Sequence, residues 1–433
     1  MSRTTEDASG PYRLAIVHSH PIEYLGPFFA RLTRHPKIDL TVLYGSRMGV
    51  APSYDPDFQV HYQWDRPLLD GYRHRFLKNV WPGREGANSF WRVFNPELLT
   101  VLSRRRFDAV LIYGWSMASF WLAFAACAVK RIPYLITGDT ILPKEQTARP
   151  RSAKSALAGL VLRRAGAALN MGQASDEFMR SHGVHPDDSF LVPYSPDVEY
   201  LQQEAARLRA ERDCLRSRYG IAPDDCVFLY AGKLIERKGV QDLLAAFGDC
   251  ARRALRSPPD LGRGLAPDLV GGRGAGGEVW LLIVGDGPLR GTLEQKVREQ
   301  GIPHVVFLGF QNQSELPAFY SLADAFILPS LREPWGVVVN EAFACGLPVI
   351  AADTVGATRD ARFFQDGRNG FVYPAGDVGQ LSERLLALAG DRDLRERMGQ
   401  AARETVGWWN YDLCVENTVK AVAHALSRRR SAG

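Results

Sequence analysis

Cysteine is scarce in this chain and is never arranged as a metal or disulfide motif. The six cysteines are scattered over 433 residues, without a CxxC pair or a Cys/His ligand spacing. This absence excludes a disulfide framework and the common types of structural zinc site. We therefore expect a protein of a reducing compartment, the cytoplasm, that folds around an ordinary hydrophobic core.

Long apolar runs and a strong charge of either sign are also missing. The longest apolar candidate, residues 119–129, is far shorter than the roughly 18 residues that a membrane-spanning helix needs. We expect a helix packed inside a domain there. Residues 1–13 lack the apolar centre of a secretory signal, and we expect a short flexible tail. The net charge of +5 is modest for this length and gives no reason to expect a nucleic-acid partner.

What the chain does contain is two series of short, continuously apolar segments that alternate with helix-like segments. Strands that are apolar throughout favour parallel sheets covered on both faces, and the length suits two domains of about 200 residues each. The sequence therefore predicts two doubly wound, Rossmann-like α/β domains facing each other, with ligands in the cleft between them. The predicted strands are residues 14–18, 40–44, 109–113, 134–137, 167–171 and 190–193, then 227–230, 280–284, 305–308, 325–329, 348–352 and 371–374.

The domain bounds follow from the spacing of these strands and from a charged, helix-like segment between the two series. Residues 257–277 are dense in Gly and Pro and show no period, which is typical of a flexible insertion. We expect an N-terminal, acceptor-side domain over residues 1–200, a connecting helix over 201–220, a second domain over 221–406, and a terminal helix within 407–433 that packs back across the boundary.

The most informative segment is residues 333–350, in which Glu333 and Glu341 stand eight positions apart around a Trp-Gly turn. The pattern predicts a strand before the pair and a helix from Val337, so that Glu333 lies on a loop and Glu341 about one turn into the helix. Gly336 stands where the backbone must come close to a ligand, and the helix start would present unpaired N–H groups to an anion such as a diphosphate.

The spacing alone would fit two exposed carboxylates on a surface helix, but the surrounding pattern favours a site. Glu341 could accept hydrogen bonds from a vicinal diol, and Glu333 could bind a sugar hydroxyl or support developing positive charge. Lys233 and Lys238 lie on another loop after a predicted strand, where two ammonium groups could neutralise a leaving diphosphate without a metal. Gly285, in the VGDGP segment, permits a tight turn near a ligand, although a lone GxG is weak on its own.

Taken in order, the segments AGKLIERKG, LLIVGDGP, VVFLGF, AFILPS and EPWGVVVNEAFACGLPVIA resemble the C-terminal domain of the retaining GT-B glycosyltransferases of family 4, over residues 226–374. The resemblance implies transfer of a sugar from a UDP- or GDP-sugar to an acceptor hydroxyl, with retention at the anomeric carbon and without a cofactor. It also implies that Glu333 meets the donor sugar and that Glu341 binds the ribose. The other donor-binding residues that we expect are Gly232, Lys233, Lys238, Gly285, Gly336 and Val337. One departure is Lys233, where the family most often has Arg.

The N-terminal half resembles the family more loosely. The segment HSHPIEYLGPFF, at residues 18–29, follows the first strand and would line the acceptor side. Many relatives carry a His-Asp pair after a middle strand, where this chain has TGDT. We take Asp139 of this segment as the first candidate for the polar role on the acceptor side, and His20 as the second. A turn or capping role explains Asp139 equally well, and a structural hydrogen bond is the more common role of such a histidine.

Metal-dependent glycosyltransferases of the other major fold hold a divalent cation with an Asp-x-Asp triplet after a buried strand. Two such triplets occur here, at residues 55–57 and 391–393. The first lies in a proline-containing loop and the second at a helix start, so we interpret both as accidental and expect no metal.

Two other functions share the expected architecture. One is a catalytically silent partner that binds a nucleotide sugar, and the other is a sugar-nucleotide epimerase of the GT-B fold; glycogen-type phosphorylases have far longer chains. The expected acceptor is a glycan, a lipid-linked sugar or a small molecule, in polysaccharide or glycoconjugate synthesis. Residues 149–164 combine basic and apolar side chains, which fits either a solvated helix or peripheral contact with the inner face of the membrane.

Overall fold

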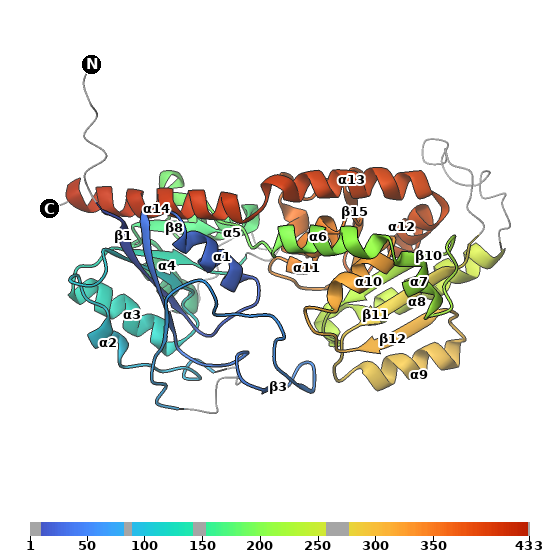
Figure 1. The fold of residues 1–433 in the computed structure, drawn as a ribbon, viewed down its shortest axis with the longest axis horizontal. Helices are drawn as coiled ribbons and strands as arrows, with labels where there is room; N and C mark the ends of the chain where they lie inside the picture. Colours follow the sequence, from blue (N-terminus) through green and yellow to red (C-terminus); the bar gives the residue numbers. More distant parts are fainter. Residues whose placement is uncertain (1–9, 82–88, 142–152, 257–276, 432–433) are drawn as a thin grey trace, which may run out of the picture. The chain divides into compact units, whose positions relative to one another are not determined.

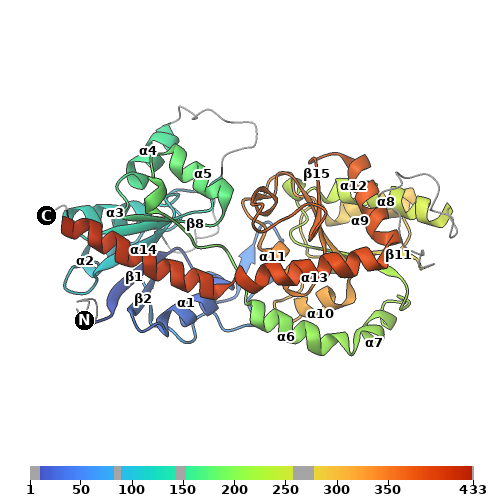
Figure 2. The same cartoon turned by 90° about the horizontal axis from the view of Figure 1, so that it is seen from above.

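The computed structural model describes residues 10–81, 89–141, 153–256 and 277–431. These residues form two compact units, each built around a parallel sheet (Figures 1 and 2). Unit 1 contains the described residues of 1–53, 67–194 and 411–433, and unit 2 those of 54–66 and 195–410. The predicted fold class of two doubly wound α/β domains is confirmed.

The sheet of unit 1 is covered on both faces, as its continuously apolar strands require. Ala15 and Val17 of the first strand belong to one core cluster, and Leu14 and Ile16, which point the opposite way, belong to another. The strand order is β5 (His74–Phe76), β2 (Ile38–Tyr44), β1 (Tyr12–His18), β6 (Ala109–Tyr113), β7 (Tyr134–Thr137), β8 (Ala167–Asn170) and β9 (Ser189–Leu191).

The helices of unit 1 divide between these two clusters. The first cluster contains residues of α3 (Ala118–Val129), α4 (Ala153–Leu162) and α5 (Gln173–Ser181), and the second contains residues of α1 (Leu25–Thr33) and α14 (Tyr411–Ser431). Figure 2 shows α14 lying along the unit 1 sheet, where it contacts β7, β8 and β9. The short helix α2 (Leu98–Val101) packs against α3.

Unit 2 repeats this architecture with a second parallel sheet. Helix α8 contacts β11, α12 contacts β14 and β15, α10 contacts β10, and α11 contacts β13 and β14. The strand order is β12 (Val305–Gly309), β11 (Val279–Val284), β10 (Cys226–Ala231), β13 (Ala325–Leu328), β14 (Val349–Ala352) and β15 (Gly370–Tyr373). The helices are α6 (Val198–Arg209), α7 (Arg212–Ser217), α8 (Val240–Arg256), α9 (Arg290–Gln300), α10 (Leu316–Leu322), α11 (Val337–Ala344), α12 (Val378–Gly390) and α13 (Arg392–Trp408).

Every strand predicted from the sequence is present, with small shifts in its bounds. Three short strands were not predicted: β5, β3 (Ser53–Asp55) and β4 (Val60–Tyr62), the last two forming a separate two-stranded sheet. None of these three strands has a fully buried residue, so they leave no apolar run in the sequence. Where one connecting helix was expected, the structure has α6 and α7. The predicted insertion lies outside the described residues except at Gly277.

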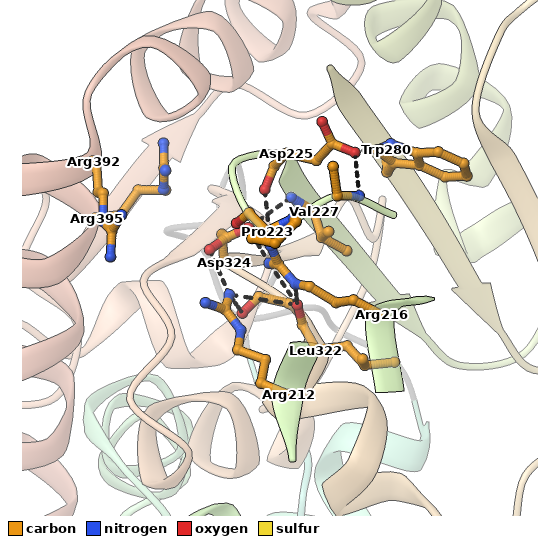
Figure 3. A network of polar contacts seen from close by, with 12 residues as sticks. Arg212, Arg216, Pro223, Asp225, Val227, Trp280, Leu322, Asp324, Arg392 and Arg395 are labelled. Atoms are coloured by element: carbon orange, nitrogen blue, oxygen red, sulfur yellow. Dashed lines mark hydrogen bonds and ion pairs between the residues drawn. The ribbon is translucent and has the colours of Figure 1, made fainter. Parts of the chain in front are cut away.

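A polar network closes the amino end of the unit 2 sheet (Figure 3). Arg216, whose side chain is only 1% exposed, forms an ion pair of 2.7 Å with Asp324, the residue before β13. Arg212 binds the other carboxylate oxygen at 2.6 Å, and the backbone N–H of Val227 donates to Asp324 at 2.8 Å. The network therefore ties the starts of β10 and β13 to helix α7.

Candidate functional site

The order of the unit 2 strands reverses between β10 and β13. We call the space outside the carboxyl ends of these two strands the crevice. From β10 the chain moves outward through β11 to β12 and then returns to β13 on the other side of β10. In such sheets, ligands bind outside the carboxyl ends of the two strands at which the order reverses. The loops that follow β10 and β13 carry Lys233 and Lys238, and Glu333 and Gly336, respectively. The two motifs predicted from the sequence therefore meet at the reversal point.

Helix α11 begins in this crevice because Gly336 adopts a conformation that other residues avoid. Gly336 has φ +93° and ψ +67° and caps the helix, which starts at Val337. A Cβ atom added to Gly336 would lie 2.8 Å from a methyl carbon of Leu328 and 3.2 Å from one of Val355. The first turn of α11 thus follows a backbone conformation that favours glycine, and it lies just after the carboxyl end of β13.

Substitution of Gly336 by valine is expected to destabilise unit 2 by about 2–4 kcal/mol, because the positive φ costs about 1–3 kcal/mol and overpacking adds to it. The matched control is Gly291→Ala in α9, where an added Cβ has no atom within 4 Å. This control should raise stability by up to about 1 kcal/mol, since alanine favours the helix. Urea denaturation of the three proteins checks both signs, and equal stability of Gly336→Val and the parent would contradict the expectation.

Glu341 lies in the second turn of α11 and is held by one neighbour. The hydroxyl of Tyr320 donates a hydrogen bond of 2.7 Å to Oε2 of Glu341. Burial raises the pKa of Glu341 above its ordinary value, and the bond from Tyr320 lowers it in part. Because its pKa is higher in the folded than in the unfolded protein, ionisation of Glu341 destabilises the fold. The stability that the protonated carboxyl group contributes is fully present below the ordinary pKa of glutamate and is lost as the pH rises through the raised value. A diol that donates to Glu341 would stabilise the ionised form.

Glu333 and Lys238 form an ion pair between the two loops, with side chains only 13% and 14% exposed. Lys238 ends a short 3-10 turn, Glu236–Lys238, and Gly239 in a left-handed conformation then leads into α8. Glu333 precedes the turn at Trp335, whose indole N–H donates to Asn340 at 2.8 Å and whose ring stacks on Trp409. Buried packing under the turn therefore fixes one end of the loop that carries Glu333.

Lys233 is also engaged by carboxylates, and these were not among the residues expected at the site. Its Nζ atom lies 3.1 Å from Asp55 and 3.0 Å from Asp57. Both belong to the Asp-x-Asp triplet at residues 55–57 that we interpreted as accidental, and the structure shows that the triplet contacts Lys233. No local spacing in the sequence links residues 55 and 233, so sequence patterns could not predict this contact.

The predicted glycines after β10 and β11, Gly232 and Gly285, allow these two loops to approach each other closely. Gly285 has φ +126°, and an added Cβ would lie 1.9 Å from the carbonyl oxygen of Gly232. The N–H of Gly232 donates to Val284 at 3.0 Å, and that of Gly285 donates to Gly309 at 2.8 Å. The loops after β10, β11 and β12 are thus joined at the edge of the crevice. Ligand contact by Gly232 and Gly285 stays a prediction.

In unit 1, the candidates His20 and Asp139 follow different strands, β1 and β7, with β6 between them. The Nδ1–H of His18 donates a hydrogen bond of 2.7 Å to the backbone carbonyl of His20. Burial lowers the pKa of His18 to about 4 and that of His20 to about 3, so both rings are neutral at pH 7. Asp139 is exposed. A catalytic role for either candidate stays a prediction.

Residues 149–152 of the basic segment lie outside the described residues, and helix α4 covers most of the rest. Val161 and Leu162 are buried in the core, whereas Leu157 and Leu160 are 48% and 40% exposed. Contact with a membrane through this segment stays a prediction. In the part of the chain that the structure describes, no helix combines the length and apolar character needed to cross a membrane.

A cavity of about 560 Å³ lies elsewhere in unit 2, lined by residues of α6, α7, α10 and α13. Asp225 and Asp324, which precede β10 and β13, form part of its wall, so it belongs to the amino end of the sheet. The predicted motifs lie at the carboxyl end. We therefore assign the candidate site to the crevice and not to this cavity.

Comparisons with known proteins show a related family and related folds. Residues 211–405 match the model of the family described as glycosyl transferases group 1. The chain is 28% identical over 243 residues to an α-D-kanosaminyltransferase of Streptomyces kanamyceticus, covering 56% of this chain and 55% of the relative. It is 31% identical over 268 residues to a GDP-mannose-dependent α-(1-6)-phosphatidylinositol monomannoside mannosyltransferase of Mycobacterium tuberculosis, covering 58% and 61%. The chain thus spans less than two thirds of the length of these relatives.

The fold also matches solved structures. The structure of HepE from Anabaena with UDP and glucose aligns with a TM-score of 0.66 and 18% identity, over 95% of this chain and 99% of HepE. The chain therefore has two parallel-sheet, Rossmann-like domains of the type found in GT-B glycosyltransferases. The family match covers the unit 2 loops that carry all of the donor-site candidates.

Proposed function

We propose that this chain is a retaining, metal-independent glycosyltransferase of family 4 that transfers a sugar from a nucleoside diphosphate sugar to an acceptor hydroxyl. The observation that carries the proposal is the meeting of three groups at the strand reversal of unit 2: the Lys238–Glu333 ion pair, the start of α11 at Gly336, and Glu341. The group 1 family match over residues 211–405 supports it.

Each group suits one part of such a donor. The ammonium groups of Lys233 and Lys238 and the N-terminus of α11 would bind the diphosphate. Glu341, with one oxygen bound by Tyr320, would accept hydrogen bonds from the ribose diol with the other. Glu333 would bind the donor sugar, next to the lysine that binds the diphosphate. The backbone of Gly232, Gly285 and Val337 would lie close to the donor.

The reaction breaks the bond between the anomeric carbon and the phosphate oxygen and forms a bond from the same carbon to the acceptor oxygen. For retention, we favour a route in which both oxygens stand on one face of the sugar and the leaving phosphate takes the proton of the acceptor hydroxyl. The positive groups at the diphosphate would then stabilise the charge that develops on the leaving group. On the acceptor side, Asp139 and His20 stay the candidates, in that order.

The name of one relative specifies GDP-mannose, and the HepE structure contains UDP. Both GDP-sugars and UDP-sugars are therefore reasonable donors for this chain. We propose a glycan, lipid-linked or small-molecule acceptor in polysaccharide or glycoconjugate synthesis, in the cytoplasm or at the inner face of the membrane. None of the relatives and structures named above favours a silent nucleotide-sugar partner or an epimerase.

The test is calorimetric binding of UDP, GDP, ADP and dTDP sugars to the wild type and to Glu341→Ala, with Glu299→Ala as control. Glu299 is an exposed carboxylate of α9. We expect one nucleotide to bind, about 10- to 150-fold more weakly to Glu341→Ala and unchanged in the control, because a hydrogen bond to a charged group contributes about 1.5–3 kcal/mol. NMR of the product then gives the anomeric configuration. Binding without turnover would favour the silent partner, and absence of binding would contradict the proposal.

A further inference from the structure

Residues 54–66 form a segment that we call the strap. The preceding residues, up to Ser53, and the following residues Pro67–Tyr194 belong to unit 1, but the strap belongs to unit 2. It contains the end of β3 and all of β4, which pair with each other and, among the described residues, with no other strand. The strap is therefore held on unit 2 by side-chain contacts and a few loop hydrogen bonds, not by the sheet.

The C-terminal part of the strap is anchored away from the crevice. The rings of Tyr62 and Trp64 lie 5.9 and 6.3 Å from that of Phe310, in the loop after β12. Further on, the Asn312 side chain donates to the carbonyl of Gln63 at 2.8 Å, and the strap's Arg66 pairs with Asp197 at 3.0 Å. These contacts involve none of the residues assigned to the donor.

The N-terminal part of the strap shares the contact with Phe310, through the ring of Phe58 at 5.3 Å, but it also lies directly on the donor loops. Asp55 contacts Lys233 through both carboxylate oxygens, at 3.2 and 3.1 Å, and Asp57 adds a third contact at 3.0 Å. The ring of Phe58 lies 5.0 Å from the same ammonium group. The carbonyl oxygen of Asp57 would be 2.8 Å from a Cβ added to Gly287, in the loop after β11.

Two carboxylates and a diphosphate cannot share one lysine without strong repulsion. Like charges about 4 Å apart repel by about 4 kcal/mol at the effective dielectric of a protein surface. Asp55 is only 19% exposed and Asp57 is 51% exposed, so water screens the first charge less than the second. A diphosphate that binds Lys233 must therefore displace Asp55 in particular.

We propose that the strap is an internal competitor of the donor: Asp55 and Asp57 occupy Lys233 until a diphosphate displaces them, and the N-terminal part of the strap then moves while its anchored part stays. The proposal rests on the proposed function, since it deepens the same site. The strap sets donor affinity through charge, and it keeps Lys233 neutralised while the site is empty.

The test begins with Asp55→Asn, Asp57→Asn and the double variant. In Asp55→Asn, the side-chain oxygen still accepts the hydrogen bonds from the N–H groups of Asp57 and Phe58, at 2.8 and 3.1 Å. The turn is therefore kept while the charge is lost. Calorimetry with UDP, GDP and inorganic diphosphate should show binding about tenfold tighter in the double variant, with most of the gain from Asp55→Asn. The control is Asp65→Asn, in the same strap but bonded to Ser314, and it should bind like the wild type.

Hydrogen exchange of the full chain gives a second readout. Amides of residues 54–60 should exchange faster when diphosphate is bound and in ligand-free Lys233→Met, whereas amides of residues 62–66 should not change. Equal or weaker binding by the double variant, or a strap that stays protected at saturating ligand, would overturn the proposal and leave the proposed function standing. Strap release by inorganic diphosphate with no binding of any nucleotide would support the competitor and count against the proposed function.

Discussion

Lys238→Met is expected to lower kcat/KM for sugar transfer by about 100- to 1000-fold, the usual effect of removing one group that stabilises charge in a transition state. Methionine keeps most of the apolar stem and removes the ammonium group. The loss has two sources: the leaving diphosphate loses a positive partner, and Glu333, with its side chain 13% exposed, loses its ion-pair partner. The measurement is initial rates with the donor identified by the binding panel.

Two further variants separate these sources. Lys238→Arg keeps the charge and should recover part of the rate, although a guanidinium does not reproduce the position of an ammonium group. Arg298→Met removes a positive charge from the exposed end of α9 and should change the rate by less than a factor of two. A Lys238→Met enzyme with nearly normal kcat/KM would show that neither the diphosphate nor Glu333 depends on Lys238 for the reaction.

The sequence predicted the sheets well because their strands are buried on both faces. Segments such as residues 226–231 and 279–284 have no polar position that could face water, so an apolar run between turns identifies them. Strands β3, β4 and β5 have no such run, since they lie at the surface. Single-sequence patterns also missed the break between α6 and α7, where Ala210 and Glu211 carry no helix-breaking signal.

The same limit applies to the candidate site. The positions of Gly336, Lys238 and Glu341 follow from local order along the chain, in which a strand, a turn and a helix succeed one another. The partners of these residues do not: Tyr320 for Glu341, and Asp55 and Asp57 for Lys233, come from other elements. A contact across 178 residues leaves no mark in local spacing, and only the fold reveals it.

Asp324→Asn is expected to lower the stability of unit 2 by about 3–5 kcal/mol, because it leaves Arg216 buried without its counter-charge. Figure 3 shows both arginines, Arg212 and Arg216, converging on Asp324. The matched control is Glu396→Gln, which breaks the ion pair with Arg392 in the same region. Both side chains of that pair are about two-thirds exposed, at 64% and 65%, so the control should cost less than about 1 kcal/mol. Urea denaturation at pH 7 measures both.

The pH dependence tests whether charge is the source of this stability. Burial alone would raise the pKa of Asp324, but the charges of Arg212, Arg216 and Arg395 outweigh it and hold the pKa below the ordinary value. A depressed pKa contributes stability that is fully present above the unfolded value, about 3.9, and is lost as the pH falls through the folded value. The difference between wild type and Asp324→Asn should therefore shrink below about pH 4. If it stayed constant down to pH 2, the shape of the side chain and its hydrogen bonds, not its charge, would hold the amino ends of β10 and β13 together.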